Sequence, residues 1–287
     1  MKKLIINADE FGLTEETNRA IIEAYQFGTV TSTTMIVNMW AFEDAIKRAK
    51  ENPGLGVGIH LNVTDGRPIL PPEKVLTLVG QDGFFTNRRS LWGKVMFSKV
   101  SLLQIEIELK GQIEKIKSSG INMTHIDVHQ AVDLHPKIFS IILKLGVELG
   151  IPIRITRQGL LFKGLDKKRS LKRCISRIVC GRYIRLANLA KVPHTDYFFK
   201  LGDFDPSANA NLVERCKLIL SSLKEGVFEL MVHPAYLDGN LVKFMNNCLV
   251  SAEKRQEELY LLLNPVVKEI ITNYKISLIN FIDLRVH

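Results

Sequence analysis

The chain has 287 residues, of which 46% are hydrophobic and 24% are charged, a composition typical of globular proteins and unlike that of disordered or fibrous chains. No apolar run approaches the ~18 residues of a membrane-spanning helix. The apolar run after Met1 ends at Asp9, too early for the hydrophobic region of a signal peptide. Four cysteines show neither CxxC pairing nor zinc-ribbon spacing, so we expect reduced thiols in a cytoplasmic protein.

The positive charge is concentrated in one segment. The net charge of the chain is +9, yet residues 154–191 contain twelve Lys or Arg against Asp166 alone, which gives this segment +11. Its apolar residues recur at nearly helical spacing, so we expect a basic amphipathic insertion at about residues 157–192.

Three roles are open for this basic segment. It can be an ordinary solvated face, or it can contact an anionic membrane surface or a lipid-linked sugar, which would place the protein at the inner surface of the membrane. The third role is nucleic acid binding. No helix-turn-helix, zinc-finger or RNP-type motif occurs, which argues against nucleic acid as a partner. The sequence leaves a homodimer open.

Strands and helices alternate over the first sixty residues. We expect strands at 3–8, 31–37 and 55–61, and helices at 14–27 and 42–50. Thr14, followed by two acidic residues, indicates the N-cap of the first helix, and Gly28 ends that helix. This β-α-β pattern is typical of a parallel sheet or barrel.

The alternation is interrupted at residues 64–100 and then returns. This stretch is rich in Pro and Gly and contains Trp92, so we interpret it as a loop insertion with short elements over the same sheet edge. Further on, we expect helices at 102–118, 136–149, 206–223, 251–263 and from 265, and strands at 123–128, 151–155, 194–199, 227–232 and 276–281. The simplest organisation is a single domain over 1–287 with two insertions.

Titratable side chains recur where predicted strands end. They are Asp9, Glu10, His60, His125, Asp127, His129 and His233. Because the carboxyl ends of parallel strands face one edge of a sheet, we expect these side chains to converge. Side chains alternate along a strand, so Asp9 and Glu10 can serve different purposes, one at a metal ion and one with a proton. Two imidazoles and a carboxylate suit Zn, Fe, Mn, Co or Ni, with other positions open for water and substrate.

Four motifs, in this order, resemble those of the YdjC-like carbohydrate deacetylases. They are NADEFG at 7–12, GIHLN at 58–62, THIDVHQ at 124–130 and MVHPAY at 231–236. As a set they are specific and span most of the chain. The resemblance implies an α/β fold, a distorted (β/α) barrel related to polysaccharide deacetylases. It also implies one divalent metal ion, Mg or Zn, and a metal-dependent hydrolase that removes the N-acetyl group from an amino sugar. We expect this sugar in an oligosaccharide or, because of the basic segment, in a lipid-linked sugar.

The resemblance assigns roles to individual residues. Asp9 matches the catalytic base, and His233 matches the histidine expected to act as general acid. Glu10 takes the position of a metal-binding aspartate, and His60 and His125 match the metal-binding histidines. The candidates for substrate contact are Asp127, His129, Arg154 and Tyr236. Arg154 falls near a family arginine that orients the base.

The chain departs from the family pattern at three places. Glu10 is one methylene longer than the family Asp, which shifts the metal ion or alters its preference. Ala131 and Asp133 stand where the family often has further histidines, and the basic segment is longer and more basic than in the family. Two alternatives stay open: a metal-dependent hydrolase of another amide or ester, and a non-catalytic protein that binds a sugar or a membrane surface through its basic segment.

Overall fold

A parallel sheet forms the centre of the molecule. The computed structural model describes residues 1–156, 171–201, 211–245 and 252–285. Within them the strands are β1 (Lys2–Phe11), β2 (Ser32–Met35), β3 (Gly56–Leu61), β4 (Ile126–Val128), β5 (Tyr197–Lys200), β6 (Gly226–Val232) and β7 (Ile276–Leu278). Their order in the sheet is β4-β3-β2-β1-β6-β5, and β7 pairs with β1. Every strand pairing is parallel.

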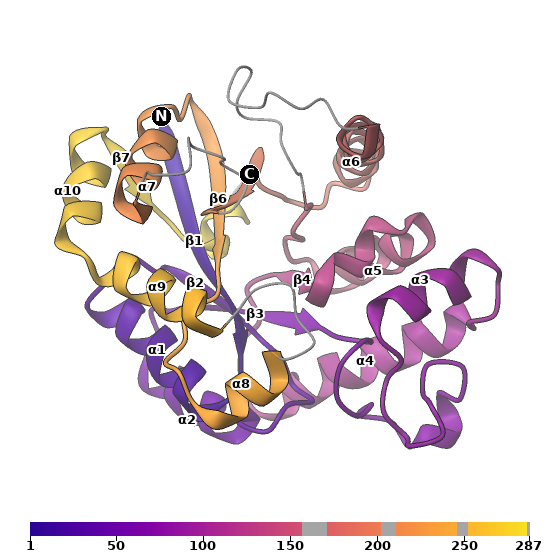
Figure 1. The fold of residues 1–287 in the computed structure, drawn as a ribbon. Helices are drawn as coiled ribbons and strands as arrows, with labels where there is room; N and C mark the ends of the chain where they lie inside the picture. The colour runs from indigo at the N-terminus through magenta and orange to yellow at the C-terminus, as the bar shows by residue number, and fades with distance from the viewer. Residues whose placement is uncertain (157–170, 202–210, 246–251, 286–287) are drawn as a thin grey trace.

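Helices surround the curled sheet (Figure 1). The α-helices are α1 (Glu15–Gln26), α2 (Phe42–Glu51), α3 (Arg88–Met96), α4 (Leu102–Ser118), α5 (Pro136–Leu149), α6 (Leu171–Leu189), α7 (Leu212–Ser221), α8 (Gly239–Met245), α9 (Ala252–Leu263) and α10 (Pro265–Asn273). The 3-10 helices are η1 (Pro72–Lys74), η2 (His129–Leu134) and η4 (Phe281–Leu284). An open, curled parallel sheet of this kind is an incomplete barrel, so the predicted α/β fold class is confirmed.

β1 is central because its residues are apolar on both faces. Leu4, Ile5 and Ile6 are almost completely buried. On one side β1 pairs with β6 along most of its length. On the other side it pairs with β7 at its amino-terminal end and with β2 at its carboxyl end. The strand therefore carries its last residues, Asp9 and Glu10, to the middle of the carboxyl edge.

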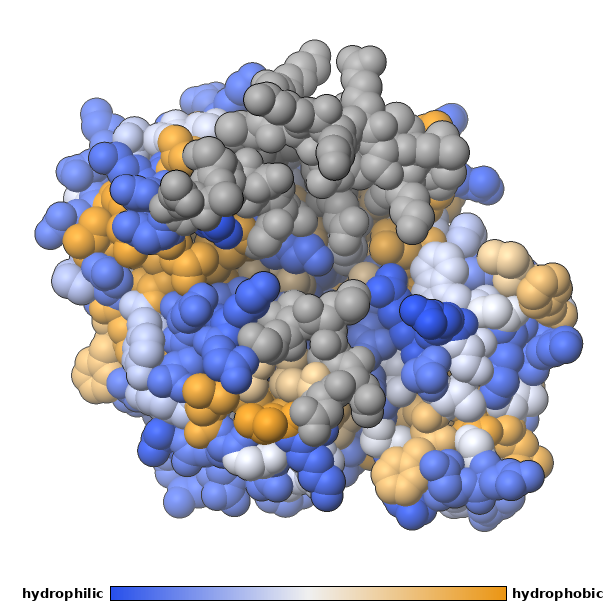
Figure 2. Space-filling view, viewed as in Figure 1, coloured by the Kyte–Doolittle hydropathy of each residue, from blue (hydrophilic) through white to orange (hydrophobic). Residues whose placement is uncertain are grey.

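The remaining apolar residues lie mainly between the sheet and its helices. The largest completely buried side chains include Phe11, Phe139, Phe228 and Phe281. The surface in Figure 2 is correspondingly mostly hydrophilic, with its apolar residues in separate patches. None of the described helices combines the length and the apolar character needed to cross a membrane.

Several elements differ from the prediction in extent. Thr14 caps α1 as predicted, accepting from the Thr17 backbone N–H at 3.1 Å. Residues 151–155 form only a single parallel bridge, Ile126 to Ile153, because β4 offers just three residues for pairing. The last strand ends at Leu278, because Asn280 caps the 3-10 helix η4. Helix α8 was not predicted.

The two predicted insertions contain helices of their own. α3 lies within residues 64–100, where only short elements were expected, and the predicted amphipathic helix appears as α6. Residues 157–170 of the basic segment and 206–210 of the predicted 206–223 helix lie outside the described residues. The organisation as a single domain with two insertions stays a prediction.

Candidate active site

Most of the predicted site residues meet at the carboxyl edge of the sheet. Asp9 and Glu10 lie near the end of β1, His60 lies near the end of β3, Asp127 lies in β4, and His129 begins η2. These five residues are called the histidine–carboxylate site below. Each exposes 4% of its surface or less. His60 and Asp127 are direct partners in the pairing of β3 with β4, which brings their side chains together.

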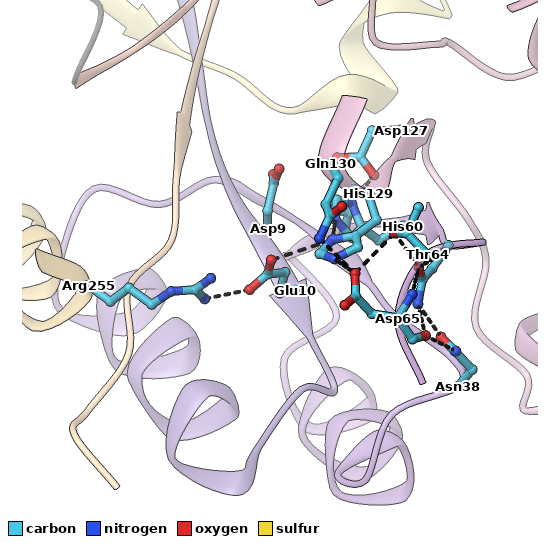
Figure 3. A network of polar contacts seen from close by, with 12 residues as sticks. Asp9, Glu10, Asn38, His60, Thr64, Asp65, Asp127, His129, Gln130 and Arg255 are labelled. Carbon is cyan, nitrogen blue, oxygen red and sulfur yellow. Dashed lines mark hydrogen bonds and ion pairs between the residues drawn. The ribbon is translucent and has the colours of Figure 1, made fainter. Parts of the chain in front are cut away.

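The backbone of β1 separates the two adjacent carboxylates. The pairing of β1 with β2 shifts register between Ala8 and Phe11, which indicates a bulge at Asp9 and Glu10. Glu10 has a φ of 72°, in the left-handed region that non-glycine residues rarely adopt. Gly12, at φ 101°, completes the turn where a Cβ would lie 2.8 Å from a backbone oxygen. Asp9 and Glu10 consequently point to different partners (Figure 3).

Arg154 fixes the orientation of Asp9. Its Nη1 and Nη2 donate to the two oxygens of Asp9 at 2.6 and 2.7 Å, a bidentate ion pair. Its Nε donates to Glu229 Oε1 at 2.6 Å, and Nη1 also lies 2.5 Å from Asp127 Oδ2. Burial opposes the charge of Arg154, but the three carboxylates outweigh burial and raise its pKa well above the usual value. Arg154 is therefore a permanent cation that holds carboxylates from three strands.

This shared guanidinium sets the charge of its neighbours. Burial alone would raise the pKa of Asp9, but Arg154 outweighs burial and holds that pKa well below its usual range. At Glu229 burial prevails over Arg154 and raises the pKa to about 7. Asp9 is thus ionised at neutral pH, whereas Glu229 is partly protonated. An ionised, rigidly held Asp9 can accept a proton.

A second ion pair holds Glu10. Arg255 of α9 donates from Nη1 to Glu10 Oε2 at 2.5 Å (Figure 3). Burial would raise the pKa of Glu10, but Arg255 outweighs it and holds the pKa well below its usual range. The other oxygen, Oε1, lies 3.5 Å from His129 Nδ1. Glu10 therefore presents an ionised oxygen to His129.

Each histidine of the site is anchored through one ring nitrogen. His60 Nδ1 lies 2.5 Å from Asp127 Oδ1, and His129 Nε2 lies 3.1 Å from Asp65 Oδ2. A carboxylate accepts the ring N–H and so favours the tautomer with the proton on that nitrogen. The other nitrogens, His60 Nε2 and His129 Nδ1, then carry lone pairs, and they face each other at 3.0 Å. Two lone pairs at this separation repel each other, so the arrangement requires either a proton between the two nitrogens or a metal ion bound by both.

A metal ion fits this arrangement. Among the described residues, two groups have ligand atoms within 4.8 Å of one another. One is Glu10, His60 and His129, and the other is Asp9, His60 and Asp127. The first fits better, because Glu10 meets Arg255 through Oε2 and keeps Oε1 toward His129, whereas both oxygens of Asp9 accept from Arg154. Two nitrogens bound to one Zn²⁺ would lie roughly 3.4 Å apart at a tetrahedral angle, close to the observed 3.0 Å. Burial lowers the pKa of His60, but Asp127 outweighs burial and raises that pKa above the ordinary value, which favours a proton on Nε2 when no metal ion is bound.

His125 belongs to neither of these groups. Its ring stacks on Phe281, with the ring centroids 3.6 Å apart, and its Nδ1 lies 2.8 Å from Thr124 Oγ1. Gly58 makes room for it, since a Cβ at that position would overlap the imidazole. Burial lowers the pKa of His125 well below its ordinary value, so the ring is neutral. The structure therefore brings His129, and not His125, beside His60 and Glu10.

His233 lies close to the site and is uncharged. Its backbone N–H donates to Glu258 Oε2 at 2.6 Å. Burial and then Arg255 lower the pKa of its ring to about 4, although Glu10 and Asp9 partly oppose them. Val232 is the partner of Ala8 in the parallel pairing of β1 with β6, so His233 follows β6 where Asp9 follows Ala8 in β1.

Tyr236 makes its contacts with α1 instead of the histidine–carboxylate site. Its hydroxyl donates to Glu23 Oε2 at 2.6 Å. The guanidinium of Arg19 lies 4.1 Å from the centre of its ring. Both partners belong to α1, so the structure does not bring Tyr236 together with the other predicted residues.

Three residues of the site were not identified from the sequence. The sequence did indicate that Arg255 is buried, because its spacing from Ala252 and Leu259 places all three on one face of α9. The sequence likewise marked Glu229, because it is the only charged residue in the apolar strand β6. Asp65 lies in a loop, and its sequence context shows no pattern that marks it.

Comparison with known proteins agrees with the motifs. The sequence model of the family described as "YdjC-like protein" matches residues 3–273. A carbohydrate deacetylase from Thermoanaerobacter pseudethanolicus is 33% identical over 285 residues, which cover 99% of this chain and 100% of that protein. A carbohydrate deacetylase from Clostridium beijerinckii is 34% identical over 282 residues, with 98% and 100% coverage.

A solved structure extends this similarity to the fold. A crystal structure from Enterococcus faecalis V583, described as a "putative cellobiose-phosphate cleavage protein", is 31% identical and has a TM-score of 0.79. The match covers 99% of this chain and 98% of that one. With motifs, family model and full-length relatives in agreement, the chain belongs to the YdjC-like family.

Proposed function

We propose that the protein is a carbohydrate deacetylase, a hydrolase that removes the N-acetyl group from an amino sugar. Membership of the YdjC-like family and the carbohydrate deacetylases among its relatives support the reaction class. The observation that carries the proposal is the approach of His60 Nε2 and His129 Nδ1 to 3.0 Å beside the ionised Glu10. Hydrolysis of an amide needs a polarised carbonyl and an activated water, and this set of ligands suits a metal ion that supplies both.

Glu10, His60 and His129 would hold the divalent metal ion. The two imidazole nitrogens favour Zn over Mg, which prefers oxygen ligands. With zinc held there, the site would supply Lewis-acid chemistry, which lowers the pKa of a water from 15.7 towards about 7. Asp127 would orient the His60 ring through Nδ1, and Asp65 would orient the His129 ring through Nε2. The proposal thus takes His129 as the second imidazole, where the family resemblance indicated His125.

Asp9 would take the proton from the attacking water. Arg154 keeps it ionised and fixes both of its oxygens. His233 would protonate the leaving nitrogen, because an amine leaves poorly from a tetrahedral intermediate unless it is protonated. With a pKa of about 4, His233 is neutral in the free enzyme and has to gain a proton before it can donate one. The proton that Asp9 takes from the attacking water would then pass to His233, so that one proton serves both transfers.

Acetate release from a panel of acetylated sugars tests the proposal. The panel contains N-acetylated monosaccharides and oligosaccharides, a lipid-linked and a phosphorylated amino sugar, and an O-acetylated sugar. Asp9→Asn should retain the metal but lower turnover by about 10²–10⁴-fold. Asp82→Asn, in an exposed loop, is the control. Wild-type turnover in Asp9→Asn would remove Asp9 as the base, and release from the O-acetyl ester alone would indicate an esterase.

We also propose that α6 contacts an anionic lipid surface, which would serve a lipid-linked substrate. Ile178, Arg182, Arg185 and Leu189 recur along α6 at spacings of three or four residues, and all four are exposed. A helical stripe of cations with apolar ends suits the interface of an anionic bilayer. Co-sedimentation should be seen with vesicles that contain anionic lipid and should weaken in Arg182→Glu/Arg185→Glu. Equal sedimentation with neutral and anionic vesicles would contradict this.

A further inference from the structure

Asp65, which orients His129, is far more exposed than Asp127, which orients His60. The side chain of Asp65 exposes 27% of its surface, whereas that of Asp127 is completely buried. A carboxylate on a surface loop can turn into water. Asp65 Oδ2 nevertheless lies 3.1 Å from His129 Nε2. The fold must therefore contain groups that hold Asp65 against the ring.

Asn62 builds the turn that carries Asp65. It follows the last residue of β3, and its side chain is completely buried. Its Oδ1 accepts from the backbone N–H groups of Thr64 at 2.9 Å and of Asp65 at 3.1 Å. Its Nδ2 donates to the Asp65 backbone oxygen at 2.7 Å. Both ends of one amide thus bind the backbone of Asp65, and this Asx turn fixes the direction in which the Asp65 side chain leaves the chain.

Helix α4 holds Asn62 in its place. Gln112 Oε1 accepts from the Asn62 backbone N–H at 3.0 Å, and Gln112 Nε2 donates to the Asn62 backbone oxygen at 2.6 Å. One helical turn away, Glu108 accepts from the backbone N–H groups of residues 69 and 70 at 2.8 and 3.0 Å. Gln112 and Glu108 are completely buried. The turn with Asp65 is therefore anchored to one helix at both of its ends.

Gln130 holds the Asp65 carboxylate from the other side. It is next to His129 in the chain, and its Nε2 donates to Asp65 Oδ2 at 2.7 Å. Its backbone has a φ of 55°, a left-handed conformation that glutamine rarely adopts and that persists only where the surrounding structure enforces it. Figure 3 shows Asp65 between the histidines and Asn38, which also lies behind the turn. The carboxylate is thus fixed at its backbone by Asn62 and at its oxygen by Gln130.

We propose that Asn62 is a positioning residue for the metal site. It keeps Asp65 against His129 Nε2, so that the ring proton stays on Nε2 and Nδ1 is directed toward His60 and Glu10. Without the amide of Asn62, the partly exposed Asp65 turns into solvent, and His129 loses the partner that orients its ring. The inference rests on the proposed function in one respect, because it takes Glu10, His60 and His129 as the metal ligands.

A double-mutant cycle on zinc affinity tests this path. Asp65→Ala should weaken zinc binding by about 10- to 100-fold, and Asn62→Ala by roughly 10-fold, because Asp65 then reaches the ring for part of the time only. Asn62→Ser should recover part of the loss, since a serine hydroxyl forms the same turn more weakly. Asn62→Ala/Asp65→Ala should bind zinc as Asp65→Ala does. Multiplied effects in the double variant would overturn the proposal.

Asn52→Ala is the matched control for the loss of a buried amide. Asn52 ends α2, its Nδ2 donates to the Arg48 backbone oxygen at 2.8 Å, and its Oδ1 accepts from Gln26 Nε2 at 2.8 Å. None of these groups belongs to the metal site. Its zinc affinity should equal that of the wild type, and thermal unfolding establishes that both Ala variants are folded.

Solvent exchange of the His129 Nε2 proton, followed by NMR, separates this inference from the proposed metal site. With and without zinc, the proton should exchange slowly in the wild type and Asn52→Ala, because Asp65 accepts it, and fast in Asn62→Ala. Slow exchange that is lost in Asn62→Ala, in a protein whose wild type binds no zinc, would refute the metal site and keep the positioning role. Equal zinc affinity and equal exchange in Asn62→Ala and a zinc-binding wild type would refute the positioning role and keep the metal site.

Discussion

Replacing Asp127 by Asn tests whether a carboxylate sets the tautomer of His60. In the wild type, Asp127 Oδ1 lies 2.5 Å from His60 Nδ1, while Oδ2 lies 2.5 Å from Arg154 Nη1 and 3.0 Å from Thr34 Oγ1. Asn has one acceptor oxygen for these partners. If that oxygen faces Arg154, the amide N–H₂ faces His60 Nδ1, and the ring proton moves to Nε2. The nitrogen that faces His129 then loses its lone pair.

The expected effect is a loss of metal affinity. Removing the partner behind a metal-binding histidine costs about 10- to 100-fold in affinity, or ~1.4–2.7 kcal/mol. Because the change to Asn also disfavours the metal-binding tautomer, we expect the upper part of this range. Competition with a chromophoric zinc chelator at constant pH measures the affinity, and acetate release at saturating zinc shows whether turnover recovers when the site is filled.

Asp133→Asn is the matched control for this experiment. Asp133 is also buried, and burial raises its pKa to about 7, so a neutral amide is a mild replacement there. It belongs to neither metal group. Thermal unfolding of both variants establishes that they are folded. Equal zinc affinity in Asp127→Asn, Asp133→Asn and the wild type would refute the assigned tautomer and the role of Asp127.

Three further variants test other contacts of the site. Gly58→Ala would force a Cβ into the His125 ring and should lower the free energy of unfolding by about 1–3 kcal/mol. The double variant Gly58→Ala/His125→Ala should recover part of this loss, and an unchanged Tm in Gly58→Ala would contradict this packing. Glu229→Gln should gain stability relative to the wild type as pH rises from about 5 to 8. Burial raises the pKa of Glu229 to about 7, so the stability that its protonated form contributes to the wild type is lost as it ionises in the folded state. A constant difference in Tm across this pH range would be inconsistent with this. Arg154→Lys cannot form the bidentate pair with Asp9, so turnover should fall while zinc is retained. Loss of turnover together with loss of bound zinc would mean that Arg154 only supports the fold.

The parts of the site that depend on strand ends could be predicted from the sequence. Asp9, Glu10 and His60 follow apolar runs, and parallel strands bring such ends to one edge whatever the details of packing. The choice between His125 and His129 depended on where β4 ends. A strand rises about 3.3 Å per residue, so His129 lies roughly 13 Å further along the chain than His125. His129 therefore reaches the edge, whereas His125 stays among core residues.

The residues that hold the metal-binding side chains in place could not be predicted in the same way. Asp65 lies in a loop and Arg255 on a helix some 245 residues from its partner Glu10. Their positions depend on how the loop and α9 pack against the sheet, which local patterns do not encode. The bulge that turns Glu10 away from Asp9 is equally a consequence of the register between β1 and β2. Glu229, a charge within an apolar strand, and Arg255, on the buried face of α9, could have been recognised as buried charges, but the sequence did not indicate their partners.

The most direct test of the metal site is the zinc content of three proteins. Wild type, His129→Ala and His125→Ala are loaded with zinc, freed of excess metal and measured for zinc per chain, with acetate release recorded on the same samples. The structure predicts one zinc ion per chain in the wild type and in His125→Ala, and loss of zinc and activity in His129→Ala. Zinc retained by His129→Ala and lost by His125→Ala would contradict the site formed by Glu10, His60 and His129.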